Sequence, residues 1–292
     1  SLSSDDSCSH YDCLYALSSD SIINTENLSI MQAKDIMHPE DAKALQILKK
    51  LRGFDDLIRV MMENGYEKQY RGDNLGCYLK VSDSNYKDIY QLFKGVVRQV
   101  GIKMPELYIY NDPVMNAYTY GETNTFVAIS SSLIERLSID ELRSVMAHEC
   151  GHILCHHTLY NTLLRTIEEL GTLLQIISYS ALGPILMAMQ YWSRKSELSA
   201  DRCEAAVVGD EVYQRTLLKM TCGLSKIEGS PYQLVEQARE YHQMKHESWW
   251  DVIQQNCRIA FNSHPQSCER ALEIDRWKHS WQYRKLRSNL SH

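Results

Sequence analysis

The stretch His148-Glu149-Cys150-Gly151-His152 decides the fold and the chemistry that this chain predicts. It has the pattern H-E-x-x-H, and two histidines four residues apart on a helix leave the same face. One metal ion can therefore contact both imidazoles, and Glu149 can reach a water molecule on that metal. The stretch predicts a zinc site with an adjacent base. The alternative is a surface helix with two solvated histidines.

The residues ahead of this stretch predict a well-capped helix. Ser138 and Glu141 have the spacing of a capping box, and Leu137 and Leu142 have the spacing of a hydrophobic staple. Gly151 inside the helix costs about 1 kcal/mol relative to Ala. We therefore predict that the backbone of another helix approaches closely at Gly151.

A second stretch, Ser196 to Arg202, offers the third ligand that a catalytic zinc requires. Glu197 and Asp201 are four residues apart, so a helix would place both on one face. Glu197 can complete a His₂Glu set, and Asp201 can accept a hydrogen bond from the second ring nitrogen of a ligand histidine. Ala200 would let this helix pack tightly against the first. The alternative is an acidic pair on a solvated helix.

The order H-E-C-G-H, then E-L-S-A-D, resembles the gluzincin zinc metallopeptidases of family M48, which include HtpX-like proteases and CAAX prenyl endopeptidases. The segment 113–118 is similar to the P-x-x-N-A strand of that family. Ser263-His264-Pro265 followed by Arg270 is similar to its late T-H-P…R segment. His38-Pro39 with Asp41, and the segment 53–55, are similar to its soluble bacterial branch. The resemblance extends from about His38 to the C-terminus.

The segment that precedes the active helix predicts a strand that binds substrate. Residues 116–120 and 125–130 form two strands joined as a hairpin through 121–124. The edge of the first strand, at Asn116, Ala117 and Tyr118, would bind an extended peptide as an added strand. The alternative for Asn116 is an ordinary turn residue.

Two later residues complete the candidate site. His264 precedes a proline and is therefore extended, in a turn and not in a helix. The resemblance implies that His264 donates a hydrogen bond to the developing oxyanion and that Arg270 braces a carboxylate beside the metal. A plain turn histidine is the alternative for His264. His156 and His157 are interpreted as ordinary histidines on a partly polar helix face, not as a second metal site.

The whole chain is predicted to be α+β and mainly helical, with the gluzincin fold and a small sheet packed on the active-site helix. Residues 1–37 would form an N-terminal extension and residues 38–292 the metallopeptidase domain. The last segment, 280–292, is basic and polar and is expected to fray. The other predicted helices cover 38–70, 86–100, 210–223 and 232–246, and further strands cover 77–81 and 107–110.

The charge and the cysteines restrict the classes of function and the compartment. A net charge of −6 argues against nucleic acid or an anionic membrane as the main partner. Nine scattered cysteines without a C-x-x-C pair favour reduced thiols in the cytoplasm over a disulfide framework. Cys150 and Cys155 are interpreted as small buried residues. Cys8, His10 and Cys13 could bind metal or block the zinc, and a plain extension is the alternative.

Residues 171–192 carry no charge and are long enough to span a bilayer. A single crossing would leave His148 and His152 on one side and Glu197 on the other, so one zinc could not bind all three. Gly183-Pro184 predicts two buried helices or an apolar hairpin. We expect no transmembrane span, with peripheral membrane contact as the alternative, since HtpX-like relatives carry membrane segments here.

The expected function is that of a zinc-dependent endopeptidase with one Zn²⁺ per chain, acting on protein or peptide substrates through a metal-activated water. One alternative is a membrane-associated quality-control protease with the same chemistry. The other is a zinc-binding scaffold without proteolytic activity.

Overall fold

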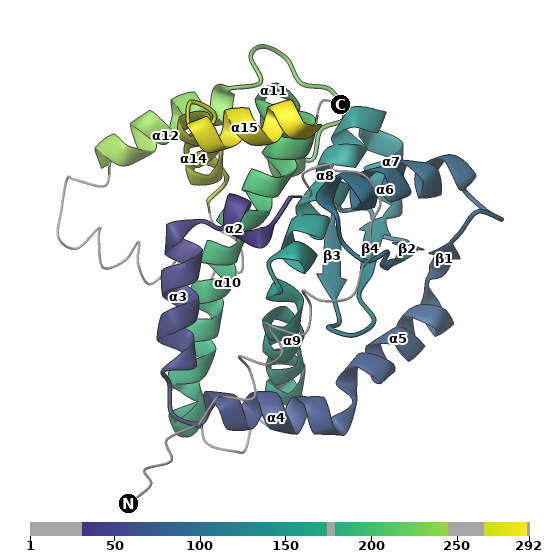
Figure 1. Ribbon diagram of the computed structural model, residues 1–292, viewed down its shortest axis with the longest axis vertical. Helices are drawn as coiled ribbons and strands as arrows, with labels where there is room; N and C mark the ends of the chain where they lie inside the picture. Colours follow the sequence, from purple (N-terminus) through teal and green to yellow (C-terminus); the bar gives the residue numbers. More distant parts are fainter. Residues whose placement is uncertain (1–30, 174–178, 245–265, 291–292) are drawn as a thin grey trace, which may run out of the picture.

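The computed structural model describes residues 31–173, 179–244 and 266–290. This part of the chain is mainly helical, with a small sheet on one side of the helices (Figure 1), which confirms the predicted class. The helices are α2 (Ala33–Ile36), α3 (Pro39–Lys49), α4 (Phe54–Asn64), α5 (Tyr66–Cys77), α6 (Lys87–Val100), α7 (Ser131–Arg136), α8 (Ile139–Leu154), α9 (His157–Leu173), α10 (Tyr179–Val208), α11 (Asp210–Cys222), α12 (Gln233–Met244), α14 (Ser267–Trp277) and α15 (Trp281–Leu290). The strands are β1 (Leu79–Val81), β2 (Glu106–Tyr110), β3 (Ala117–Tyr120) and β4 (Phe126–Ser130).

The four strands lie in the order β1-β2-β4-β3, so β3 is an edge strand. β2 and β4 are parallel, whereas the β1–β2 and β3–β4 pairs are antiparallel. The predicted β3–β4 hairpin is therefore confirmed. Alternate residues of β4 face opposite sides of the sheet: Val127 and Ile129 join the main core with α6 and α8, and Phe126 and Ala128 join a cluster of tyrosines.

The helices that carry the two motifs, α8 and α10, pack directly against each other. A Cβ atom at Gly151 would lie 2.7 Å from Cys203 Cβ and 3.1 Å from Ala200 Cα, which confirms the predicted close approach. The capping box of α8 is also present: Ser138 Oγ accepts from the Glu141 N–H, and Glu141 Oε2 accepts from the Ser138 N–H at 2.8 Å. Local sequence thus starts α8, and the missing side chain at Gly151 sets its distance from α10.

Replacing Gly151 with Ala is expected to lower the free energy of unfolding by about 1–3 kcal/mol, because the added methyl group would overlap Cys203. The matched control is Gly95→Ala in α6, where nothing lies within 4 Å of the added Cβ. Gly95→Ala should raise the free energy of unfolding by up to about 1 kcal/mol, because Ala has a higher helix propensity than Gly. Thermal unfolding of both variants checks this, and equal stabilisation by both would contradict the close packing.

The predicted break at Gly183-Pro184 is wrong, because α10 runs through both residues. Pro184 lies in the second turn of α10, where a proline forfeits a single backbone hydrogen bond near the start of the helix. Beyond it, Ile185, Met189 and Trp192 are buried in a cluster with residues of α3, α4 and α9. Among the described residues, no helix has both the length and the apolar character needed to cross a bilayer.

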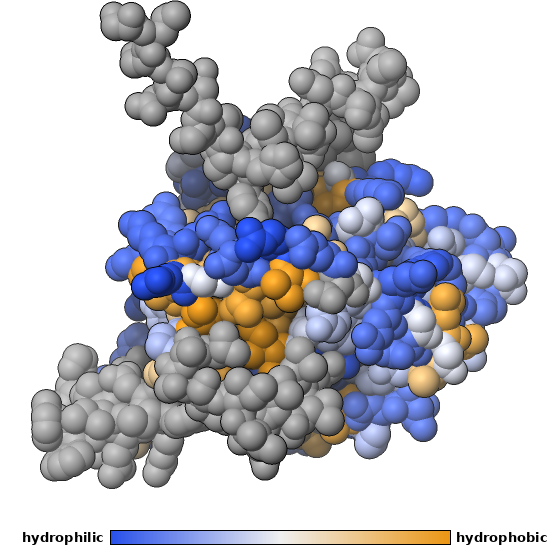
Figure 2. All heavy atoms as spheres, turned by 90° about the horizontal axis from the view of Figure 1, so that it is seen from below, coloured by the Kyte–Doolittle hydropathy of each residue, from blue (hydrophilic) through white to orange (hydrophobic). Residues whose placement is uncertain are grey.

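Some apolar side chains are exposed at the end of the molecule that carries α4. Figure 2 views the molecule from this end and shows a hydrophobic area bordered by hydrophilic residues. Val60 and Met62 of α4 are 49% and 52% exposed, and Met187 of α10 is 64% exposed. α4 and α10 therefore present apolar groups to solvent as well as to the core.

The C-terminal segment does not fray as predicted but forms α15, with Leu286 buried. The guanidinium group of Arg287 donates to the carbonyl oxygens of Ala206 and Val207 at 3.0 and 2.9 Å. These carbonyls belong to the last turn of α10, where a cation is favourable. The hydrogen bonds of Arg287 to the end of α10 therefore help to order α15, although the composition of α15 is polar.

The packed core also includes residues before His38, the predicted start of the domain. Met31 is 2% exposed, and Ile36 of α2 is fully buried in the main core. Cys150 and Cys155 are buried, as predicted. The possible metal ligands at residues 8, 10 and 13 lie outside the described residues.

Candidate active site

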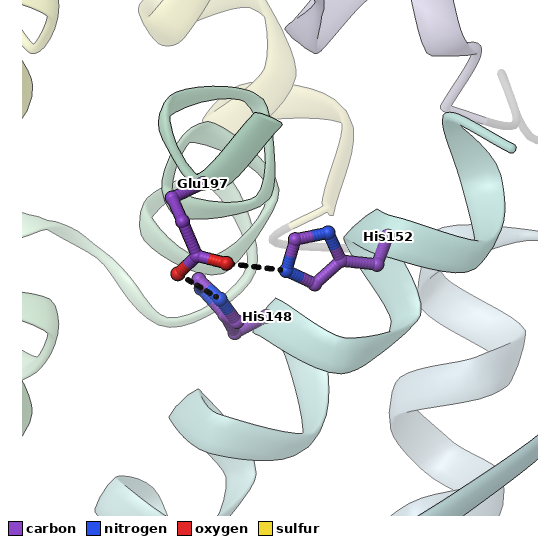
Figure 3. A group of neighbouring side chains, drawn as sticks. All are labelled: His148, His152 and Glu197. Atoms are coloured by element: carbon purple, nitrogen blue, oxygen red, sulfur yellow. Dashed lines mark ion pairs between the residues drawn. The ribbon is translucent and has the colours of Figure 1, made fainter. Parts of the chain in front are cut away.

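The packing of α8 against α10 brings the three candidate zinc ligands together. Figure 3 shows the carboxylate of Glu197, from α10, pointing at the rings of His148 and His152 on α8. Glu197 Oε2 lies 3.3 Å from His148 Nε2, and Glu197 Oε1 lies 3.2 Å from His152 Nε2. One donor atom from each residue lies within 4.8 Å of the others.

This donor set fits a zinc ion. Two imidazole nitrogens and one carboxylate oxygen are a ligand set of catalytic zinc sites, which keep the fourth position for water. Tetrahedral donors about 2.0–2.1 Å from zinc lie roughly 3.3–3.4 Å from one another, close to the spacing between Glu197 and the rings. Burial would raise the pKa of Glu197, but its contacts with both histidines and the charge of Arg270 hold it well below the usual range. Glu197 is therefore a carboxylate.

Glu149 and the edge strand β3 line the same cavity as the ligands. The cavity has a volume of about 690 Å³ and lies among α8, α9, α10 and β3. Burial raises the pKa of Glu149, while the neighbouring histidines oppose the rise. A carboxylate with a raised pKa is better suited to accept a proton and return it at neutral pH.

The main-chain groups of β3 alternate between its partner strand and the cavity. The Asn116 carbonyl accepts from the Ser130 N–H at 2.9 Å, and the Asn116 N–H donates to Ser130 Oγ at 3.0 Å. Since antiparallel pairing alternates, the N–H and C=O groups of Ala117 and Thr119 face the free edge. Asn116, Ala117 and Tyr118, for which the sequence predicts a role in binding substrate, line the cavity.

Asp201 and Arg270 lie behind the ring of His148. Asp201 Oδ1 is 3.2 Å from His148 Nδ1. Arg270, on α14, binds Asp201 with two hydrogen bonds, Nε to Oδ2 at 2.8 Å and Nη2 to Oδ1 at 2.6 Å. Its Nη1 atom also lies 3.4 Å from Glu197 Oε2. Arg270 thus contacts both Asp201 and Glu197, the two acids that the sequence placed on one helix face. The other late candidate, His264, lies outside the described residues.

Three further residues lie behind the rings and are not among the site residues that the sequence predicted. Glu204 Oε2 lies 3.2 Å from His148 Nδ1. Glu204 follows Glu197 by seven residues, so a helix places both on the same face, and this spacing could have indicated its position from the sequence. His157 is buried and its Nδ1 is 2.9 Å from His152 Nδ1, so its interpretation as an ordinary helix histidine is wrong. Asp41, on α3, lies behind His157, with Oδ2 2.9 Å from His157 Nε2. No local sequence pattern indicates this contact.

The sequence of this chain is similar to those of known metallopeptidases. The model for peptidase family M48 matches residues 83–278, about two thirds of the chain. Plastoglobule-localized metallopeptidase 48, chloroplastic, of Arabidopsis thaliana is 28% identical over 261 residues, which cover 88% of this chain and 76% of that protein. Protease HtpX of Legionella pneumophila (strain Corby) is 23% identical over 237 residues, which cover 65% of this chain and 76% of that protein.

A solved structure is also similar, the crystal structure of S. mikatae Ste24p, with 17% identity and a TM-score of 0.44. The similarity covers 80% of this chain and 62% of that chain, so this chain spans less than two thirds of its length. The segment matched by the family model contains both stretches that carry the candidate metal ligands, and it contains Arg270. The resemblance inferred from the motifs is confirmed, and the chain belongs to peptidase family M48.

Proposed function

We propose that this chain is a zinc-dependent endopeptidase in which His148, His152 and Glu197 bind one zinc ion and Glu149 is the general base. The observation that carries the proposal is the approach of one Glu197 carboxylate to both Nε2 atoms, at 3.2 and 3.3 Å, beside the cavity that Glu149 lines. Membership of a peptidase family supports a protein or peptide substrate.

A zinc ion held by His148, His152 and Glu197 would lower the pKa of a coordinated water to about 7 and would polarise the scissile carbonyl. Glu149 accepts a proton from the attacking water and then delivers it to the leaving amine. Asp201 and Glu204, both near His148 Nδ1, hold that ring with its Nε2 toward Glu197. His264 remains a candidate donor to the oxyanion.

The test is cleavage of casein or an unfolded protein by the purified chain, before and after a zinc chelator and after zinc is restored. We expect cleavage that the chelator removes and zinc recovers. A chain that binds one zinc ion but leaves these substrates intact would instead support the zinc-binding scaffold.

The substrate is proposed to lie along β3 as an added strand, bonded to the free main-chain groups of Ala117 and Thr119. Ala117→Pro removes the outward N–H, and prolines are tolerated on edge strands. Since one hydrogen bond contributes about 0.5–1.5 kcal/mol, KM for an extended peptide should rise about 2- to 10-fold. Ala117→Ser keeps the N–H and is the matched control. Equal KM values for the two variants would place the substrate elsewhere.

A further inference from the structure

A buried chain of hydrogen bonds leads from His152 away from the cavity to a different part of the fold. His152 Nδ1 lies 2.9 Å from His157 Nδ1, and His157 Nε2 lies 2.9 Å from Asp41 Oδ2. His157 and Asp41 are 1% and 0% exposed. Asp41 belongs to α3, which lies alongside α10 (Figure 1) and is 116 residues before His157.

An unusual backbone conformation at His156 makes the hydrogen bond between His152 and His157 possible. Along a continuous helix, a residue five positions after His152 would be rotated by about 140° from it. α8 instead ends at Leu154, and His156 adopts a left-handed conformation with φ of 56°. Such a φ is uncommon outside glycine. The turn redirects the chain so that His157, the first residue of α9, faces back toward His152.

The donors around Asp41 define the direction of each hydrogen bond. Asp41 accepts from Ser199 Oγ at 2.5 Å and from Trp192 Nε1 at 3.1 Å. Burial raises the pKa of Asp41, but hydrogen bonds from His157, Ser199 and Trp192 lower it overall, so the group is a carboxylate. A carboxylate is an acceptor only, and therefore the proton between Asp41 and His157 is carried by His157 Nε2.

The direction of this bond determines the tautomers of both histidines. Two ring nitrogens that share one hydrogen bond, here at 2.9 Å, need one donor and one acceptor. A neutral His157 with its proton on Nε2 has a bare Nδ1, which can only accept. His152 Nδ1 must then carry the proton that His157 Nδ1 accepts. A metal ion held by Glu197 would therefore meet the lone pair of His152 Nε2, because the single proton of a neutral His152 would lie on Nδ1.

We infer that Asp41 and His157 are positioning residues, which hold His152 in the one ring orientation and tautomer that presents an Nε2 lone pair to a metal ion. The inference rests on the proposed zinc site and extends it by two residues outside both ligand stretches. Partners of this kind on the second nitrogen of a ligand histidine commonly change metal affinity by about 10–100-fold.

The test measures zinc affinity of the full chain by chelator competition, together with the visible spectrum of the cobalt-loaded protein. The amide of Asp41→Asn has one oxygen that accepts and one NH₂ group that donates. It can therefore accept a hydrogen bond from Trp192 or from His157, but its NH₂ group cannot accept the other. His157→Leu removes the acceptor, whereas His157→Gln restores an oxygen that can accept from His152. We expect about 10–100-fold weaker zinc binding and a changed cobalt spectrum for Asp41→Asn and His157→Leu, and recovery toward the parent for His157→Gln.

Leu48→Ala is the matched control, because Leu48 is fully buried on the same helix as Asp41 but belongs to the apolar cluster. It should lower the melting temperature and keep the parent affinity and spectrum. Parental affinity and spectrum in both Asp41→Asn and His157→Leu would overturn the inference while leaving the zinc site intact. Failure of the parent chain to bind zinc would instead overturn the proposed function.

Discussion

Glu149→Gln is expected to keep zinc bound and to lower kcat by about 10²–10⁴-fold. The amide has nearly the same size and lies beside the same ligands, so the coordination of His148 and His152 should persist. It cannot accept the proton of the attacking water, and the step assigned to Glu149 is lost. Turnover of a peptide substrate and the zinc content per chain are the two measurements.

The matched control for this change is Glu168→Gln, because Glu168 is an exposed carboxylate that lines the same cavity. It removes one negative charge from the cavity without changing a neighbour of the ligands, so kcat should stay within a few-fold of the parent. Unchanged turnover in Glu149→Gln would refute its assignment as the base. Loss of zinc from Glu149→Gln would assign the residue to metal binding instead.

Glu197→Ala is expected to weaken zinc binding by more than about 100-fold, since loss of a direct ligand should exceed the effect of an outer partner. Activity should fall with zinc occupancy and should not return at moderate zinc concentrations. The fold should persist, because Arg270 keeps its two hydrogen bonds to Asp201. Chelator competition and metal analysis measure the effect.

Glu273→Ala provides the comparison for Glu197→Ala. Glu273 is also paired with a histidine, His38 Nε2 at 3.2 Å, but it lies on α14 and lines no part of the cavity. Its loss should leave zinc affinity at the parent value. Full zinc occupancy in Glu197→Ala under competition would remove Glu197 from the ligand set.

Several features that the sequence predicted well involve residues that are close in the chain. The capping box of Ser138 and Glu141, the shared face of His148 and His152, and the β3–β4 hairpin each depend on spacings of a few residues. Helix and strand geometry converts such spacings into directions without reference to the rest of the fold. The lone Gly151 also carried long-range information, since a glycine inside a helix needs a packing reason.

Other features depend on segments that are far apart in the sequence. The polar composition of residues 280–292 predicted fraying, yet Arg287 reaches the end of α10 and Leu286 is buried. Gly183-Pro184 predicted a break, yet α10 continues through it toward Trp192, which packs in the core. In both cases tertiary contacts outweigh local propensity, as packing often does.

The sequence by itself determined which residues are candidates for a zinc site, because two histidines, a glutamate between them and a later acidic pair have the spacings of such a site on helices. Only the tertiary structure decided which groups support the ring of His152. The left-handed turn at His156 and the packing of α3 on α10 bring Asp41 and His157 behind His152. No periodicity encodes that contact, since it joins residues of different elements through a turn whose direction the packed core sets.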